Sequence, residues 1–160
     1  MLKTGLTLSW IVLLAITTAS QQPVVTPGQP EELKGVTRLY VNAASKDARD
    51  NIIAEIKKRL PQLTFAERSE DAEVWLLFSM QLRSFPKGDP TSGLTSSAAG
   101  TTIQYELVAS GAVIKPVTKE SAHRLFEFRD TSETTLSFPE QALSTKFARG
   151  FVKSYRKVNP

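Results

Sequence analysis

The sequence predicts an α+β domain in which a mostly antiparallel sheet of four to five strands packs two helices on one face. Two stretches, Ala72 to Arg83 and Thr101 to Ile114, show an apolar alternation of period two that is typical of long strands with one buried face. Two other stretches, after Ser45 and after Ser137, carry apolar residues every three or four positions, as amphipathic helices do. These helices can cover the buried face of the sheet.

Residues 1–20 are expected to be a secretory signal peptide that is removed from the mature protein. Lys3 precedes an apolar run from Leu6 to Ile16, and small residues follow this run up to Ser20. The run is shorter than the roughly 20 residues that cross a bilayer, so the mature chain is predicted to contain no integral membrane span. Cleavage after Ala19 or Ser20 would release the protein into the periplasm or the medium.

Residues 21–34 are interpreted as a flexible tether rich in proline and glutamine, and residues 35–160 as a single domain. A chain of 160 residues without cysteine must be stabilised by its hydrophobic core. The missing cysteine also excludes disulfides, thiol nucleophiles, zinc-cysteine sites and lipid attachment at a lipobox. For an exported protein, this absence fits a bacterial envelope better than a eukaryotic secreted module.

The first half of the domain is expected to form a strand, a helix and a second strand. A short strand covers Val36 to Val41, and Ser45 is the expected N-cap of the helix that ends at Pro61. The second strand is expected at Leu63 to Glu67. It leads through an acidic turn into the long strand that begins at Ala72.

The second half is expected to be an antiparallel meander closed by a helix. Gly111 is expected at a bulge or bend of its strand. A further strand follows from Ala122 to Asp130, with Leu125 on the face opposite to the two phenylalanines that come after it. The final helix is expected to open with a capping box at Ser137 to Glu140. Its apolar stripe consists of Leu143, Phe147, Phe151 and Tyr155, broadened by Ala148 and Val152.

No motif in the sequence supports catalysis or cofactor binding. His123 is the only histidine, and it could act as a base with a serine of the loop from Ser84 to Gly100 in a small secreted hydrolase. Because the sequence has no G-x-S-x-G elbow, a hydrolase is the alternative and a non-enzymatic protein is the main prediction. No metal or cofactor is expected, since the acidic cluster does not follow calcium-loop spacing. This cluster comprises Glu67, Glu70, Asp71 and Glu73.

Positive charge gathers at the C-terminus of a chain whose formal net charge is +4. Residues 146–160 contain five basic residues and no acidic one, namely Lys146, Arg149, Lys153, Arg156 and Lys157. Their spacing places them along the final helix, opposite its apolar stripe. Such a basic face could bind anionic lipid headgroups, lipopolysaccharide phosphates or an acidic envelope protein. Alternatively, it is a solvated surface whose charges complement the helix dipole. Nucleic acid is not expected as a partner, because export separates the protein from it.

Four segments, Thr37 to Asn42, Asp47 to Leu60, Glu70 to Leu76 and Lys146 to Lys153, resemble a group of uncharacterised bacterial exported proteins. Their coarse pattern is similar to the amino-terminal domain of TolB and related envelope accessory proteins, in which an acidic-Ala-acidic phrase enters a long strand. The resemblance implies a non-enzymatic envelope role and supplies no catalytic residue. The main prediction is therefore an exported, monomeric or weakly associating binding module of the bacterial envelope.

Overall fold

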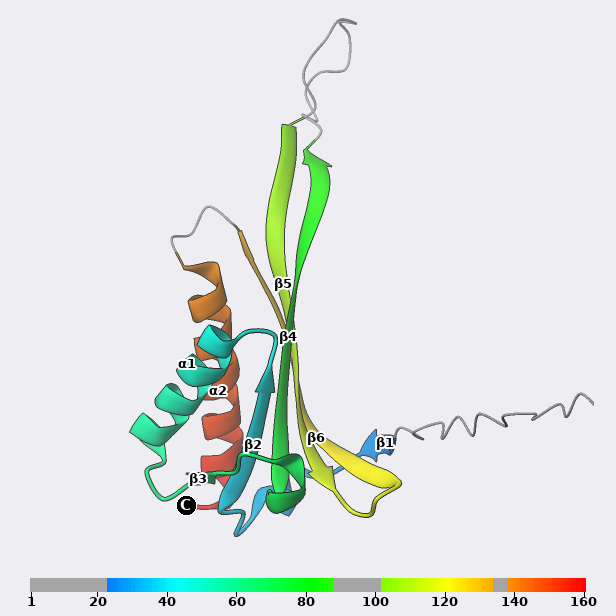
Figure 1. Cartoon of the computed structure of the whole chain (residues 1–160), viewed down its shortest axis with the longest axis vertical. Helices are drawn as coiled ribbons and strands as arrows, with labels where there is room; N and C mark the ends of the chain where they lie inside the picture. Colours follow the sequence, from blue (N-terminus) through cyan, green and yellow to red (C-terminus); the bar gives the residue numbers. More distant parts are fainter. Residues whose placement is uncertain (1–22, 88–101, 134–137) are drawn as a thin grey trace, which may run out of the picture.

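The computed structural model describes residues 23–87, 102–133 and 138–160, which form a sheet with two helices against one of its faces (Figure 1). The strands are β1 (Val24–Pro27), β2 (Arg38–Ala43), β3 (Thr64–Phe65), β4 (Val74–Lys87), β5 (Thr102–Pro116) and β6 (Ser121–Glu133). The helices are α1 (Lys46–Arg59) and α2 (Pro139–Val158), and two short 3-10 helices are η1 (Pro30–Leu33) and η2 (Ser69–Asp71). The predicted α+β class is confirmed, but the sheet has six strands and not four to five.

The sheet has the strand order β1-β6-β5-β4-β2-β3 and is antiparallel only at its centre. β4, β5 and β6 form the predicted antiparallel meander. β2 runs parallel to β3 and β4, because α1 carries the chain back along the sheet before the next strands begin. β1 is also parallel to its neighbour β6, and it comes from residues for which no strand was predicted.

The core lies between the sheet and the helices. α2 buries the stripe that the sequence predicted, Leu143, Phe147, Phe151 and Tyr155. The ring of Phe147 lies 5.3 Å from that of Phe78 on β4 and 5.6 Å from that of Phe128 on β6, measured between centroids. α1 contributes Ala48, Ile52 and Ile56. The helical periodicity of the sequence therefore identifies the faces that pack on the sheet.

Gly111 lies under the side chain of Phe147 and not at a bulge. It pairs in regular register with Phe78 on β4 and Phe128 on β6. A Cβ atom at this position would lie 2.6 Å from Cε2 of Phe147, a distance that real contacts do not reach. Glycine is required here because the helix approaches the strand so closely.

The bulge of the sheet lies in β6, at Leu125. Val113 pairs with Phe126 and Ile114 pairs with Arg124, so Leu125 is an extra residue between them. As a result the neighbours Leu125 and Phe126 both pack against the core, although strict alternation had placed them on opposite faces. The sequence pattern on either side of a bulge cannot be read with one continuous period of two.

The described part of the N-terminal segment belongs to the domain and is not a flexible tether. β1 pairs with the start of β6, and Leu33 at the end of η1 has 0% of its surface exposed. The expected domain boundary at residue 35 is therefore too late. Proline content suggested a tether, but Pro27 ends an edge strand and Pro30 begins η1, and proline is tolerated at both kinds of position. The expected signal peptide, residues 1–20, lies outside the described residues.

The two helices begin in different ways. Ser45 caps α1 as predicted, since its Oγ accepts a hydrogen bond from the Ala48 amide at 3.0 Å. At α2 the N-cap residue is Phe138, whose side chain makes no capping hydrogen bond. The capping box expected to start at Ser137 is therefore wrong, and Ser137 itself lies outside the described residues. Glu140, its expected second member, forms a hydrogen bond with the Ser45 hydroxyl instead.

β4 and β5 extend beyond the helices as a long hairpin (Figure 1). β2 pairs with β4 from Val74 to Phe78, and β6 pairs with β5 as far as Glu106. Among the described residues, the outer parts of β4 and β5 pair only with each other, up to Lys87 and Thr102.

Candidate functional site

The predicted basic face of α2 is divided by neighbouring acidic side chains. Lys146 Nζ lies 2.7 Å from Oδ2 of Asp130 on β6, and Arg149 Nε lies 3.0 Å from Oε1 of Glu55 on α1. These two cations are thus partly neutralised by residues that are remote in sequence. Lys153 remains exposed on the same helix.

Four cationic side chains gather where the last turn of α1 meets α2. Arg59 on α1 and Arg149, Lys153 and Arg156 on α2 line, together with Val152, a hollow of about 310 Å³. We call it the basic hollow. Nη2 of Arg156 also donates a hydrogen bond to the carbonyl oxygen of Arg59 at 2.8 Å, and it thereby satisfies one of the free carbonyls at the end of α1.

Glu55 holds two arginines of the basic hollow in place. Its Oε1 accepts hydrogen bonds from Nε of Arg59 at 2.8 Å and from Nε of Arg149 at 3.0 Å. The hydrogen bond from Arg59, and after it that from Arg149, lowers the pKa of the Glu55 carboxyl below its ordinary value. Because an arginine has five N–H donors, both guanidinium groups keep further donors for a ligand.

The chemistry of the basic hollow fits an anionic oxygen ligand. Four cations line the hollow and the Glu55 carboxylate pairs with two of them, Arg59 and Arg149, so positive charge is in excess among these residues. Planar guanidinium groups bind phosphate or carboxylate oxygens in pairs, and the ammonium group of Lys153 adds a point charge on a flexible stem. The side chain of Val152 supplies a small apolar contact.

Three of the five predicted basic residues line the basic hollow, and Lys146 and Lys157 do not. Sequence analysis missed Arg59 and Glu55, which belong to the other helix. A glutamate four residues before an arginine was a signal for an ion pair on one helix face. No spacing in the sequence indicated that this pair would meet Arg149.

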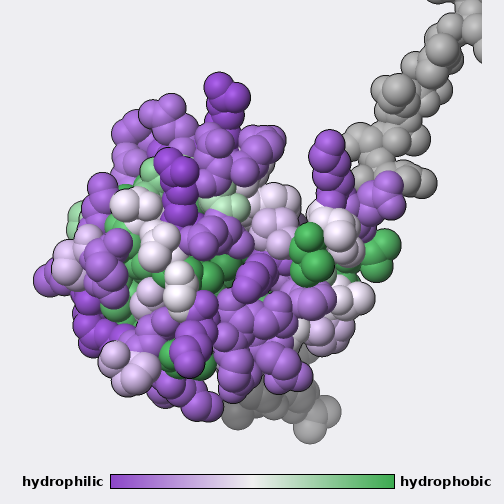
Figure 2. Space-filling view, turned by 90° about the horizontal axis from the view of Figure 1, so that it is seen from below, coloured by the Kyte–Doolittle hydropathy of each residue, from purple (hydrophilic) through white to green (hydrophobic). Residues whose placement is uncertain are grey.

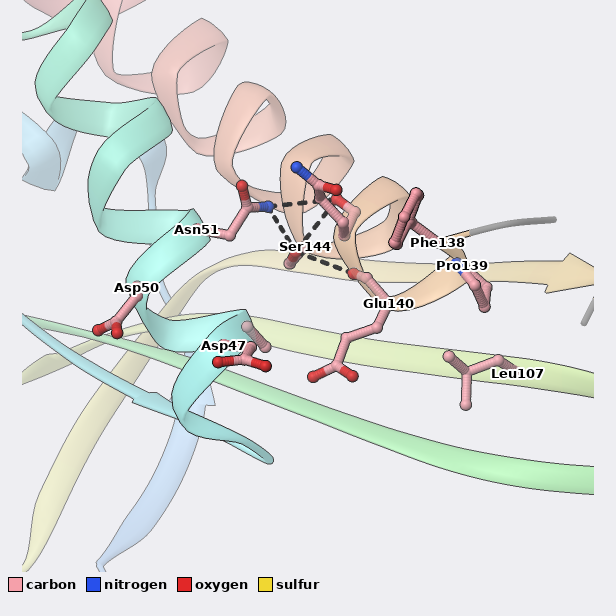
Figure 3. A pocket seen from close by; sticks show the side chains of 10 residues that line it. Asp47, Asp50, Asn51, Leu107, Phe138, Pro139, Glu140 and Ser144 are labelled. Carbon is pink, nitrogen blue, oxygen red and sulfur yellow. Dashed lines mark hydrogen bonds between the residues drawn. The ribbon is translucent and has the colours of Figure 1, made fainter.

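A second hollow, of about 520 Å³, lies between the starts of the two helices and β5 (Figure 3). Asp47 and Asp50 on α1 and Glu140 on α2 line it with carboxylates, while Leu107 and Phe138 supply apolar surface. Among the described residues, no lysine or arginine lines this hollow. We call it the acidic hollow.

A polar network fixes the two helix starts beside the acidic hollow. Nδ2 of Asn51 on α1 lies 2.7 Å from Oγ of Ser144 on α2 (Figure 3). The same Nδ2 lies 3.0 Å from Oγ1 of Thr145, also on α2. The Ser144 hydroxyl donates a hydrogen bond to the carbonyl of Glu140 at 2.9 Å. Since Ser144 is fully buried, these bonds satisfy polar groups that would otherwise destabilise the core.

His123 lies far from the described serine of the serine-rich segment. It pairs in register with Lys115 on β5, whereas Ser84 pairs with Tyr105 on the same strand. At roughly 3.3 Å per residue, the two positions are about 33 Å apart along the sheet. Nδ1 of His123 instead lies 2.8 Å from Oε2 of Glu32, so this histidine helps to attach the N-terminal segment to β6.

The rest of this segment, residues 88–101, lies outside the described residues. Its two ends are joined to Lys87 and Thr102, and their pair lies about 43 Å along β5 from the position of Lys115. The hydrolase alternative, which combines His123 with a serine of this segment, therefore stays a prediction for these residues.

The acidic cluster near η2 has a structural explanation. Oε2 of Glu73 accepts hydrogen bonds from the backbone amides of Thr37 at 2.7 Å and Arg38 at 2.8 Å. These bonds, that of Thr37 first, lower the pKa of Glu73 and link the start of β4 to the start of β2. The other three acidic residues of the cluster, Glu67, Glu70 and Asp71, are exposed, and the last two belong to η2. Within residues 23–87, 102–133 and 138–160, no group of three or more metal-ligating side chains is placed to hold an ion.

Comparisons with known proteins give matches among solved structures. No protein-family model and no curated protein matches the sequence. A minor lipoprotein from Acinetobacter baumannii is similar with a TM-score of 0.38 and 9% identity, over 76% of this chain and 95% of that one. An uncharacterized lipoprotein B from Nitrosomonas europaea is similar with a TM-score of 0.34 and 14% identity, over 83% of this chain and 85% of that one. Similarity at this level does not carry function across, and the resemblance to TolB stays a prediction. No helix in the described part of the chain has the length and apolar character that crossing a bilayer requires.

Proposed function

We propose that this protein is a non-enzymatic binding module of the bacterial cell envelope, and that its basic hollow engages phosphate-bearing headgroups at an anionic membrane surface. One observation carries the proposal. Four cationic side chains, Arg59 from α1 and three from α2, line one hollow, and Glu55 pairs with two of them.

The arrangement of Arg59 and Arg149 favours binding because it is formed before the ligand arrives. Ordering a long side chain at an interface costs about 0.5–1.5 kcal/mol, and Glu55 has already ordered both arginines. The ion pairs position the guanidinium groups and leave part of their donors for phosphate oxygens. A row of separate surface lysines would have neither advantage.

The expected binding is weak, reversible and dependent on salt. Each lysine or arginine near an anionic leaflet contributes about 1 kcal/mol. This contribution decreases with distance from the membrane surface over a screening length of about 8 Å at physiological ionic strength. Glu55 offsets part of it, so binding at an anionic surface should decline steeply as salt is raised.

Vesicle flotation tests the proposal with the mature protein. The variant Lys153→Glu reverses an exposed charge of the basic hollow, and Lys119→Glu makes the same change in net charge at the exposed turn between β5 and β6. Lys153→Glu lowers the net charge of the basic hollow by two units, which corresponds to about 2 kcal/mol of binding free energy at about 1 kcal/mol per charge. Binding to vesicles of anionic phospholipid should therefore weaken about 30-fold. Lys119→Glu should stay within about twofold of the parent. Arg149 is left unchanged, because reversing it would place a second carboxylate beside Glu55.

The outcomes are distinct. Equal binding of the parent to neutral and anionic vesicles, or equal losses in the two variants, refutes the proposal. Capture by an acidic protein with no binding to either kind of vesicle also refutes it. Binding restricted to vesicles that contain lipopolysaccharide supports the proposal and identifies the source of the phosphate.

A further inference from the structure

The outer edge of β4 has no partner strand among the described residues. β2 pairs with β4 as far as Phe78, and no described strand pairs with this edge from Ser79 to Lys87. The Phe78 carbonyl accepts a hydrogen bond from the Ala44 amide at 2.9 Å, so the backbone groups of Phe78 point toward β2. Because successive strand residues alternate, the N–H and C=O groups of Met80 and Leu82 point outward from the same edge. An extended peptide can pair there by continuing the line of β2.

This edge lacks the usual protection at its inner end. Lysine and proline commonly prevent unwanted pairing of edge strands. In β4 they occur at Pro86 and Lys87, at the far end of the hairpin, while Ser79 to Leu82 contains neither. The stretch nearest to the helices is therefore the accessible part of the edge.

Exposed apolar side chains accompany the open edge. Leu82 pairs directly with Leu107 on β5, so both side chains lie on the face of the hairpin that carries the helices. Leu82 is 63% exposed, and Phe138, which lines the acidic hollow together with Leu107, is 71% exposed. By contrast, the opposite end of the molecule has a mostly hydrophilic surface with small hydrophobic patches (Figure 2).

The charge beside this apolar surface selects the partner. The acidic hollow is lined by three carboxylates, from Asp47, Asp50 and Glu140. Asp50 is paired with Lys46 at 2.6 Å and Glu140 with the Ser45 hydroxyl, whereas Asp47 is an exposed side chain in the first turn of α1. A cationic ligand complements this lining, and an acidic one is repelled.

We propose that an extended, cationic and amphipathic segment of a partner protein adds as a strand to the outer edge of β4. Its apolar side chains contact Leu82 and Leu107, and its lysine or arginine side chains enter the acidic hollow. Main-chain hydrogen bonds to Met80 and Leu82 provide affinity, while the two side-chain contacts provide specificity. This surface is separate from the basic hollow, so either proposal can fail without the other.

A pair of synthetic peptides tests the surface. One alternates valine and lysine, and the other has glutamate in place of each lysine. The lysine peptide should bind the mature protein at least about tenfold more tightly than the glutamate peptide in a fluorescence anisotropy titration, because its charges complement the acidic hollow. On binding, hydrogen exchange at the Met80 and Leu82 amides should slow, as expected for new strand pairing.

Matched variants distinguish this surface from the rest of the molecule. Leu82→Lys should weaken the lysine peptide about tenfold, because it removes an apolar contact and adds a like charge, and Asp47→Asn should weaken it about threefold. The controls Val24→Lys and Asp71→Asn change an exposed valine and an exposed aspartate elsewhere and should have little effect. Circular dichroism verifies that each variant is folded.

Three results would overturn the proposal. The first is equal binding of both peptides, and the second is an equal loss in a control variant. The third is self-association of the parent that Leu82→Lys abolishes, which would identify a second copy of the chain as the occupant of the edge.

Discussion

Gly111→Ala tests the closest contact between the sheet and α2. The added methyl group would lie 2.6 Å from Cε2 and 2.7 Å from Cδ2 of Phe147, and 3.2 Å from the carbonyl oxygen of Leu77. The ring of Phe147 cannot retreat easily, because it is fully buried. The rings of Phe78, Phe126 and Phe128 lie 5.3, 6.3 and 5.6 Å from it, between centroids. The substitution therefore overpacks the core.

The expected loss of stability follows from two opposing effects. Forcing an extra carbon into a packed core costs about 1–3 kcal/mol. Replacing glycine by alanine reduces the freedom of the unfolded chain and offsets about 0.4–1 kcal/mol of this cost. The free energy of unfolding of Gly111→Ala should thus fall by about 1–2 kcal/mol, with a decrease in Tm of several degrees.

Urea titration of the mature protein measures this loss. The sequence has two tryptophans, and Trp10 belongs to the expected signal peptide, so Trp75 on β4 is the reporter of the mature chain. Ser110→Ala, at the neighbouring exposed position, is the control and should change stability by less than about 0.5 kcal/mol.

A second variant makes the reasoning specific to the Phe147 ring. Phe147→Leu should destabilise the parent, but it should cost about 1 kcal/mol less when Gly111→Ala is present, because the methyl group then occupies space that the ring has left. A neutral or stabilising Gly111→Ala, or additive effects of the two substitutions, would refute the reasoning.

Two further predictions concern the N-terminal segment and Glu73. Leu33→Ala should lower the free energy of unfolding by about 2–5 kcal/mol, since it leaves a cavity in the core, whereas a tether residue would show an unchanged urea midpoint. Glu73→Ala should cost about 1 kcal/mol at pH 7, a value reduced by the solvent exposure of the carboxylate, while Glu120→Ala at an exposed turn should have little effect. Hydrogen bonds lower the folded-state pKa of Glu73 below the ordinary 4.5, so its contribution is present above that pH and is lost as the pH falls through the folded-state pKa. The stability of Glu73→Ala and of the parent should therefore converge in acid, and a constant difference from pH 7 to about pH 3 would contradict this explanation.

The sequence by itself determined the elements with long, regular periodicity. α1 and α2, the central meander β4-β5-β6 and the N-cap at Ser45 all follow from local patterns. Residues that face the core recur every two positions in a strand and every three or four in a helix. The apolar pattern of a stretch of ten or more residues therefore indicates which of the two it forms. The α+β class follows from the order of these elements.

Short or irregular features could not be predicted in this way. β1 is too short to show a period, and it forms because β6 offers it an edge. The bulge at Leu125 shifts the alternation by one residue within a single strand. Gly111 looks the same in sequence whether it serves a bulge or a close approach by Phe147, and only the position of α2 distinguishes the two.

The candidate site was decided by the tertiary structure to a larger extent than the fold. Sequence spacing placed five basic residues on one helix, but it did not indicate that Glu55 and Arg59 would join Arg149, or that Asp130 would pair with Lys146. The electrostatic character of a side chain depends on charges within a few ångströms, and those charges come from segments that are distant along the chain. Long helices and strands can be recognised from patterns among neighbours in sequence, whereas a binding surface depends on which residues folding brings together in space.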